Sequence, residues 1–158
     1  MKNVLKLSLA GLAIATLAAC GGGGSSDVTD AYVGTWKSIC FASTNSPTFT
    51  KRIRTYTKVS ATEMTSSTTF DGPFSDAGCA NSAGNWSSNV PSVSRYVLGA
   101  KITYLGANAD SYTVTFADNT QNRGYMIVDG SKLFLVDTPT TSAPPSGGWS
   151  IYAPYTKQ

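Results

Sequence analysis

The sequence predicts an all-β protein, folded as a single antiparallel up-and-down barrel of about eight strands. Short runs of β-branched and aromatic residues alternate with clusters of turn-forming residues from position 32 to the end of the chain. No segment of this region shows a convincing apolar period of 3.6 residues, which argues against helices. Closure into a barrel would also remove the exposed edges that many short strands otherwise leave unpaired.

The expected strands are short and are bounded by Gly, Pro, Asn and Ser residues. They are expected at residues 32–41, 48–59, 62–70, 94–99, 101–105 and 111–117, with a short extended piece at 149–155. A polar stretch at 71–92 is expected to form a long loop. Asp129-Gly130 lies between two apolar runs and predicts a hairpin with a type I′ turn, because both central residues of that turn need a positive φ.

The first thirty residues have the pattern of an export signal. Lys2 and Lys6 precede an uncharged stretch at 7–19, whose length of about 20 Å as a helix falls short of the ~30 Å hydrocarbon core of a bilayer. The segment "LAAC" at 17–20 resembles the lipobox of bacterial lipoproteins. This resemblance implies cleavage before Cys20 and lipidation of Cys20. The alternative is a plain signal peptide with an incidental cysteine.

These features divide the chain into three parts. They are a lipoprotein signal peptide at 1–19, the lipidated cysteine with a flexible Gly/Ser tether at 20–30, and a folded domain at 31–158. In bacterial lipoproteins an aspartate after the cysteine favours retention in the inner membrane, and Gly21 occupies that position here. The resemblance therefore implies a protein that is anchored by lipid to the outer membrane and faces the periplasm.

Charge and cysteine content narrow the possible partners. The chain has 12 basic and 9 acidic residues, and loss of Lys2 and Lys6 with the signal leaves ten against nine, which gives no reason to expect nucleic acid as a partner. Once Cys20 is assigned to lipid, Cys40 and Cys79 remain, and an oxidising periplasm favours a disulfide between them. A free redox pair is the alternative, although no C-x-x-C motif is present.

"GTW" at 34–36 resembles the glycine-x-tryptophan opening of lipocalins, and "FSDAGC" at 74–79 and "GYMIVDGSKLFLVD" at 124–137 follow it. This order of motifs resembles that of small lipocalin-like lipoproteins of Gram-negative bacteria. The resemblance implies a lipocalin-like barrel, although the long polar segment around Cys79 departs from a standard lipocalin. Within such a barrel, Trp36 either plugs the floor or lines a ligand cavity.

The expected strand at 48–59 carries the one concentration of positive charge. Alternation along this strand places four side chains on one face: Arg52, Arg54, Tyr56 and Lys58. One interpretation is a solvated strand face whose charges discourage edge-to-edge pairing. The alternative is contact with an anionic group, such as a phospholipid or lipopolysaccharide head group or the acidic patch of a partner protein.

The sequence offers little catalytic or metal-binding chemistry. It contains no histidine, which excludes Ser-His-Asp and Cys-His catalysis and the usual histidine-containing zinc sites. We therefore expect a binding protein rather than an enzyme, with no metal and no cofactor. The expected ligand is a small apolar or amphipathic molecule. The alternative is a protein-binding envelope module, such as an inhibitor of a wall-degrading enzyme or an assembly partner.

Overall fold

A computed structural model describes residues 27–44, 46–84, 90–104, 106–138 and 154–158. The elements of this part of the chain are η1 (Val28–Ala31), β1 (Gly34–Ser38), β2 (Phe41–Ala42), β3 (Phe49–Lys58), β4 (Glu63–Phe74), β5 (Ser92–Tyr104), β6 (Ala107–Thr115), β7 (Gln121–Asp129), β8 (Lys132–Thr138) and β9 (Tyr155–Lys157). The predicted signal peptide, Cys20 and most of the extended piece expected at 149–155 lie outside the described residues.

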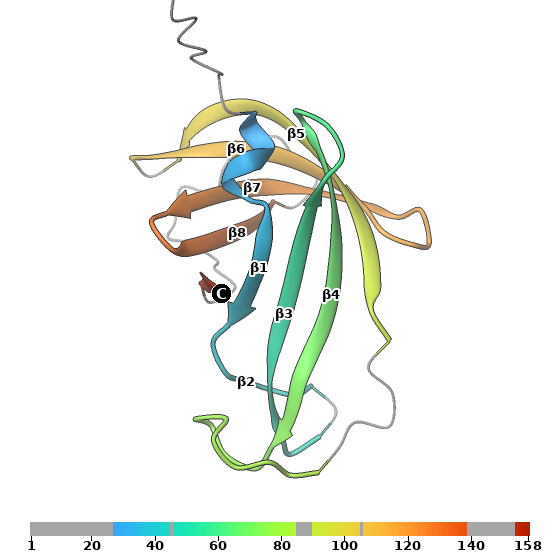
Figure 1. Cartoon of the computed structure of the whole chain (residues 1–158), viewed down its shortest axis with the longest axis vertical. Helices are drawn as coiled ribbons and strands as arrows, with labels where there is room; N and C mark the ends of the chain where they lie inside the picture. The colour runs from blue at the N-terminus through green and yellow to red at the C-terminus, as the bar shows by residue number, and fades with distance from the viewer. Residues whose placement is uncertain (1–26, 45, 85–89, 105, 139–153) are drawn as a thin grey trace, which may run out of the picture.

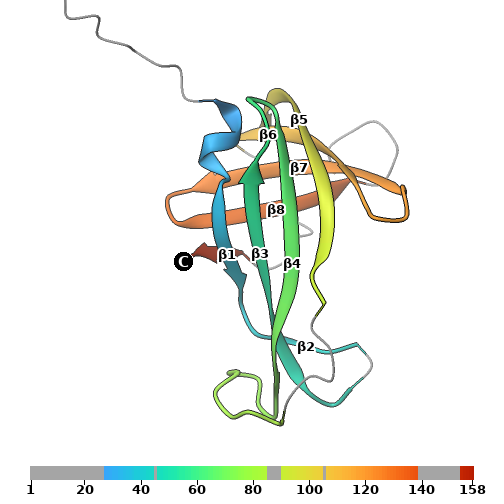
Figure 2. The same cartoon turned by 45° about the vertical axis from the view of Figure 1, so that its right-hand side comes forward.

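The strands form one closed antiparallel barrel, which confirms the predicted all-β up-and-down fold (Figure 1). From β3 to β9 each strand pairs with the next one along the chain, and β1 pairs with both β3 and β9. Eight strands therefore close the barrel, and the two-residue strand β2 adds to β3 outside this circuit. Figure 2 shows that β7 and β8 cross behind β1, β3 and β4 at a steep angle.

β5 is one continuous strand where two were predicted, at 94–99 and 101–105. The register with β6 shifts between Leu98 and Lys101, which marks a bulge. The residues in this interval, Gly99 among them, interrupt the alternating pattern in the sequence. A bulge absorbs such an interruption by bending the strand rather than ending it, so the pattern break was wrongly interpreted as a strand boundary.

β4 is longer than predicted, and the β3–β4 hairpin extends beyond the rest of the barrel (Figure 1). The prediction ended this strand at residue 70, yet its ladder with β3 continues to the pair Phe49–Phe74. Asp71, which was predicted to begin a loop, lies within the strand, and its carboxylate is 2.6 Å from Lys37 Nζ. This ion pair helps to offset the low strand propensity of aspartate.

β7 and β8 form the predicted hairpin, but the turn between them differs from the predicted one. Asp129 pairs with Lys132, so the two central residues are Gly130 and Ser131. Gly130 has a φ of 56°. Glycine at the first central position is typical of a type II′ turn, and the predicted type I′ turn centred on Asp129 and Gly130 is therefore wrong.

The barrel interior is filled mainly by aromatic, methionine and leucine side chains. Alternation along each strand turns every second residue inward, and these residues form one core cluster. Its buried members are Tyr32, Trp36, Tyr56, Met64, Tyr96, Leu98, Tyr112, Val114, Met126, Leu133, Leu135 and Tyr155. The interior of an eight-stranded barrel is just wide enough to be filled by such side chains.

A second cluster explains why the sequences of β7 and β8 are continuously apolar rather than alternating. Ile127 and Val136 lie on the face of these strands that points away from the interior, and they are nevertheless buried. The sheet is therefore covered on both faces at these positions. Continuous apolar runs are typical of strands that are buried on both faces.

One end of the barrel is closed by η1 and by Tyr32, which follows it (Figure 2). The Tyr32 hydroxyl donates to Asp110 Oδ2 at 2.6 Å, and Trp36 Nε1 donates to the Tyr32 carbonyl at 2.7 Å. Lys58 Nζ, at the end of β3, lies 2.7 Å from the Asp30 carboxylate of η1. These contacts fix η1 over the fully buried Trp36, which lies in the floor of the barrel.

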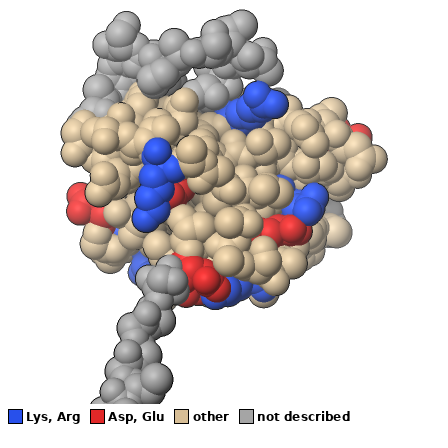
Figure 3. Space-filling model, turned by 90° about the horizontal axis from the view of Figure 1, so that it is seen from above, with Lys and Arg blue, Asp and Glu red and all other residues tan. Residues whose placement is uncertain are grey.

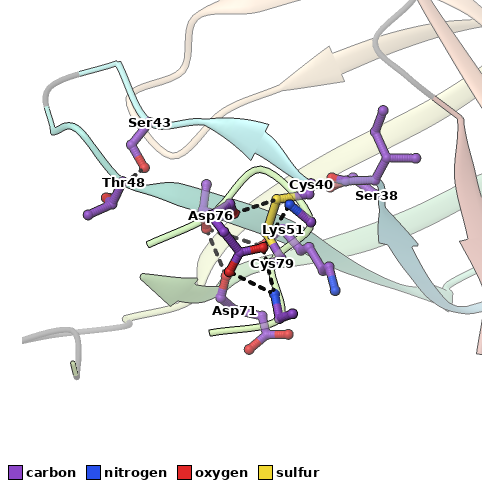
Figure 4. Close-up of a disulfide and its surroundings, with 12 residues drawn as sticks. Ser38, Cys40, Ser43, Thr48, Lys51, Asp71, Asp76 and Cys79 are labelled. Carbon is purple, nitrogen blue, oxygen red and sulfur yellow. Dashed lines mark hydrogen bonds between the residues drawn. A yellow bond between two sulfur atoms is a disulfide. The ribbon is translucent and has the colours of Figure 1, made fainter. Parts of the chain in front are cut away.

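The predicted disulfide between Cys40 and Cys79 is present and lies toward the end of the molecule opposite η1 (Figures 1 and 4). Its Cα atoms are 5.8 Å apart, and the bond fastens the β4–β5 connection to the segment between β1 and β2. Beside it, the Asp76 carboxylate accepts hydrogen bonds from the backbone N–H groups of Asn81 and Gly78. These hydrogen bonds, that of Asn81 above all, lower the pKa of Asp76.

Gly124→Ala should destabilise the barrel, because a Cβ at this position would lie 2.2 Å from the Val136 carbonyl oxygen and 2.6 Å from the Tyr112 hydroxyl. Overpacking of this kind lowers the unfolding free energy by about 1–3 kcal/mol, which urea denaturation measures. Gly99→Ala is the control. The atom nearest to its added Cβ would be the rotatable Ser111 hydroxyl, so this variant should lower the unfolding free energy by less. Equal losses in the two variants would contradict this account of the packing.

Candidate functional site

The basic face of β3 points into the barrel rather than into solvent. Arg54 pairs with Trp36 of β1 on one side and with Thr68 of β4 on the other. Directly paired residues lie on the same face of a sheet, so the fully buried Trp36 places Arg54 on the inside. Arg52 and the buried Tyr56 lie on this face as well, as predicted. The interpretation of the face as solvated is therefore wrong for Tyr56, and Arg54 is only partly exposed.

Arg54 lies among three phenol groups. Its Nη1 donates to the hydroxyls of Tyr96 at 3.2 Å and Tyr56 at 3.5 Å, and its guanidinium carbon is 5.6 Å from the ring centroid of Tyr155. Its Nε is buried and has no hydrogen-bond partner among the described residues. Within the same part of the chain, no ion pair joins Arg54 to a carboxylate. Removing a cation from water in this way costs free energy, unless an anion lies beside it and offsets the desolvation.

The surroundings keep the phenols neutral and the arginine charged. Burial raises the pKa of Tyr56, the neighbouring Tyr96 raises it further, and Arg54 lowers it by a smaller amount. Burial also lowers the pKa of Arg54, but Tyr56, Tyr96 and Tyr155 together raise it by more. At neutral pH the interior therefore holds a permanent positive charge beside hydroxyl groups that keep their protons.

Arg52 lies between two aromatic rings, further from the floor than Arg54. Its guanidinium carbon is 5.5 Å from the ring centroids of both Phe41 and Phe70, and its Nη1 donates to the Tyr155 hydroxyl at 3.4 Å. Its backbone N–H donates to Ser38 Oγ at 2.8 Å, which ties β3 to the end of β1. Cation–π contacts thus hold this guanidinium at the end of the barrel remote from η1.

Small hydroxyl side chains line the wall beside the arginines. On β4, Ser66 pairs with Tyr56 and Thr68 with Arg54, and on β5 Ser94 pairs with Ser66. Ser66 is fully buried, and its Oγ has no hydrogen-bond partner in the described part of the chain. Ser66 Oγ and Arg54 Nε, which have no hydrogen-bond partner among the described residues, therefore occupy the same interior. We call the group formed by these side chains the arginine–serine site: Arg52, Arg54, Ser66, Thr68 and Ser94.

Lys58, the fourth residue predicted on the basic face, lies outside this site. It is near η1, where its Nζ is 2.7 Å from both the Asp27 and the Asp30 carboxylates, and its side chain is exposed. Hydrogen bonds to these two carboxylates, Asp27 first, raise the pKa of Lys58. Trp36, the remaining predicted contact, forms the floor, and Lys157 Nζ lies 5.3 Å from its ring centroid. The structure thus brings together four of the five predicted contacts, since Trp36 pairs directly with Arg54, and places Lys58 apart from them beside η1.

Several residues of the site were not predicted. The alternation from Met64 to Phe70 carried a signal for Ser66 and Thr68, since it placed both hydroxyls on a face that begins and ends with a large apolar residue. Tyr155 gave no such signal, because only closure of the barrel brings the last strand beside β1. Local patterns show which residues share a face but not which strands meet across the interior.

The chemistry of the arginine–serine site is set by its two guanidinium groups. A guanidinium remains charged throughout the physiological pH range, so it binds and orients acceptors but does not transfer protons. Among the described residues, no group of three or more His, Cys, Asp or Glu side chains lies close enough to hold a metal ion. No helix in the described ranges is long and apolar enough to cross a membrane.

Arg54→Met should leave the unfolding free energy unchanged or raise it by about 1 kcal/mol, because it replaces a partly buried cation by an apolar chain of similar length. Urea denaturation of the two proteins measures the difference. A loss of about 3–5 kcal/mol, the size found when one partner of a buried ion pair is removed, would show instead that Arg54 has a structural counter-ion.

Comparison with known proteins assigns no family to the chain. No protein-family model, no curated protein and no solved structure matches it. The resemblance of "GTW" to the opening of lipocalins therefore stays a prediction, and the interpretation of the arginine–serine site depends on its own geometry.

Proposed function

We propose that this protein is a lipid-anchored binding protein of the bacterial envelope that holds a small amphipathic ligand in its barrel. The proposal depends above all on one observation: Arg54 Nε and Ser66 Oγ lie in the interior without hydrogen-bond partners among the described residues. A buried polar atom left unpaired costs about 1–3 kcal/mol, and native proteins rarely tolerate it without a reason. A ligand that bonds both atoms would remove this cost.

In this proposal the ligand enters through the end of the barrel remote from η1. The η1 end is occupied by Tyr32 and Trp36, which are both buried. The other end carries Arg52 between Phe41 and Phe70, and the Phe70 side chain is 37% exposed. Accessible aromatic rings followed by buried polar groups suit a molecule with one apolar and one polar part.

The proposed anchor is an acyl modification of Cys20. Asp27 leads directly into η1, so the tether joins the barrel at its closed end (Figures 1 and 2). Figure 3, which views the molecule from this end, shows Lys and Arg side chains interspersed with Asp and Glu. Attraction to anionic lipid needs clustered positive charge, so the proposal assigns membrane attachment to acyl chains rather than to this face.

Anilinonaphthalene, an uncharged probe that fluoresces in apolar surroundings, should bind the mature chain carrying Cys20→Ser, which needs no detergent. Ser94→Phe should abolish binding, because it places a ring on the inward face beside Ser66. Val93→Phe is the matched control, since it adds the same ring one residue earlier, on the outer face, where Val93 is 52% exposed. Fluorescence titration measures each Kd. Failure of the parent chain to bind, or unchanged binding by Ser94→Phe, would count against the proposal.

Cys20→Ala should prevent incorporation of labelled palmitate when the full chain is expressed in a Gram-negative host, because no other residue is proposed to carry acyl chains. Labelled protein is detected on a denaturing gel, so the readout does not depend on folding. Cys40→Ala, which removes a disulfide cysteine instead, should keep the label. Label that persists in Cys20→Ala would refute the anchor.

A further inference from the structure

We propose that the polar group of the ligand is an oxyanion, and that it binds between the guanidinium groups of Arg52 and Arg54 with the head group directed toward the floor of the barrel. This inference rests on the proposed function, to which it adds the charge and the direction of the ligand. Carboxylate, sulfonate and phosphate monoester groups share the required chemistry, because each presents at least two acceptor oxygens to a planar guanidinium.

The charge of Arg54 favours an anionic ligand. The hydrogen-bond acceptors of Arg54 among the described residues are the hydroxyls of Tyr56 and Tyr96, which carry no charge at neutral pH. The ion pairs that join two described side chains involve Lys37, Lys58 and Arg95, and not Arg54. An uncharged ligand would leave the desolvation cost of Arg54 in place, whereas an anionic ligand would offset it.

The hydrogen-bond donors of the site also favour an oxyanion. Arg54 Nε can only donate a hydrogen bond, and the Ser66 hydroxyl can donate one to any nearby acceptor. Arg52 lies two residues along the same face, so the Cα atoms of the two arginines are about 7 Å apart along the strand. An ionised oxyanion only accepts hydrogen bonds, so it matches this set of donors. A cationic group would be repelled by both arginines.

The positions of the aromatic and polar side chains determine the direction in which the ligand binds. The aromatic side chains Phe41 and Phe70 flank Arg52 at the remote end, and Phe70 is partly exposed. Ser66 and the Nε atom of Arg54 are buried deeper in the barrel. The apolar part of the ligand therefore lies against the two phenylalanine rings, while the anionic group enters first and lies next to Arg54.

One acidic residue of β8 occupies a register position on the inward side of the sheet. Asp137 of β8 pairs with Gly124 of β7, which in turn pairs with the buried Tyr112 of β6. This register puts Asp137 at an inward position, while its side chain lies outside the described part of the structure. Neutralisation of Arg54 by this residue would make an external anion unnecessary, so the test includes Asp137→Asn.

The test compares anilinonaphthalene with anilinonaphthalene sulfonate, which differs from it by one anionic group, on the mature chain carrying Cys20→Ser. The parent chain should bind the sulfonate more tightly than the neutral probe. Arg54→Met should weaken binding of the sulfonate by about tenfold to hundredfold, the loss expected for one charge-assisted hydrogen bond, and leave the neutral probe unchanged. Lys58→Met is the matched control, because it removes the same charge from the same face of β3 outside the site, and it should change neither affinity.

The possible outcomes separate the two proposals. Failure of the parent chain to bind either probe would overturn the proposed function. Equal binding of both probes, unchanged in Arg54→Met, would overturn the oxyanion inference alone. An equal loss of sulfonate binding in Lys58→Met would attribute the effect to net charge and would also overturn that inference. A rise in sulfonate affinity of about tenfold or more in Asp137→Asn would show that the chain supplies its own anion, and the oxyanion inference would again be overturned.

Discussion

The pairing of β1 with β3 on one side and β9 on the other is the constraint on which the rest of the structure depends. An open sheet made of the same strands would expose both faces of β3, and Arg54 would lie in water. Closure gives the sheet an inside, and alternation along each strand then assigns every residue to one side. The inward position of Arg54 beside Trp36 is therefore a result of topology and not of the hydropathy of β3.

Closure of the barrel also decides which structural features could be predicted from the sequence and which could not. The strand-rich class and the Cys40–Cys79 bond follow from local composition and from counting cysteines, and both are confirmed. The shared face of Arg52, Arg54 and Tyr56 follows from alternation and is confirmed as well. The side of the sheet on which that face lies depends on closure between strands far apart in the sequence. Period-two patterns contain no information on such pairings, so the solvated interpretation was wrong for the buried Tyr56, although Lys58 at the end of the strand is exposed.

The arginine–serine site differs from the rest of the interior. Large side chains fill most of the barrel, as its small diameter requires. On β4 and β5, however, Ser66, Thr68 and Ser94 occupy inward positions beside the arginines, so polar atoms gather in one region. Departures from good core packing that are concentrated at one place, while the surrounding core stays apolar, are typical of proteins in which a binding site lowers stability locally.

The disulfide also determines when the aromatic wall of the site is complete. Cys40 directly precedes Phe41, whose ring lies beside Arg52, and β2 itself contributes only two residues of ladder. The bond to Cys79 is thus the main covalent restraint on the position of that ring. In the proposed scheme, a newly made chain whose sulfurs are still reduced would hold its ligand poorly. Export into an oxidising compartment would then act as the maturation step that switches binding on, and would keep the protein from trapping anions inside the cell.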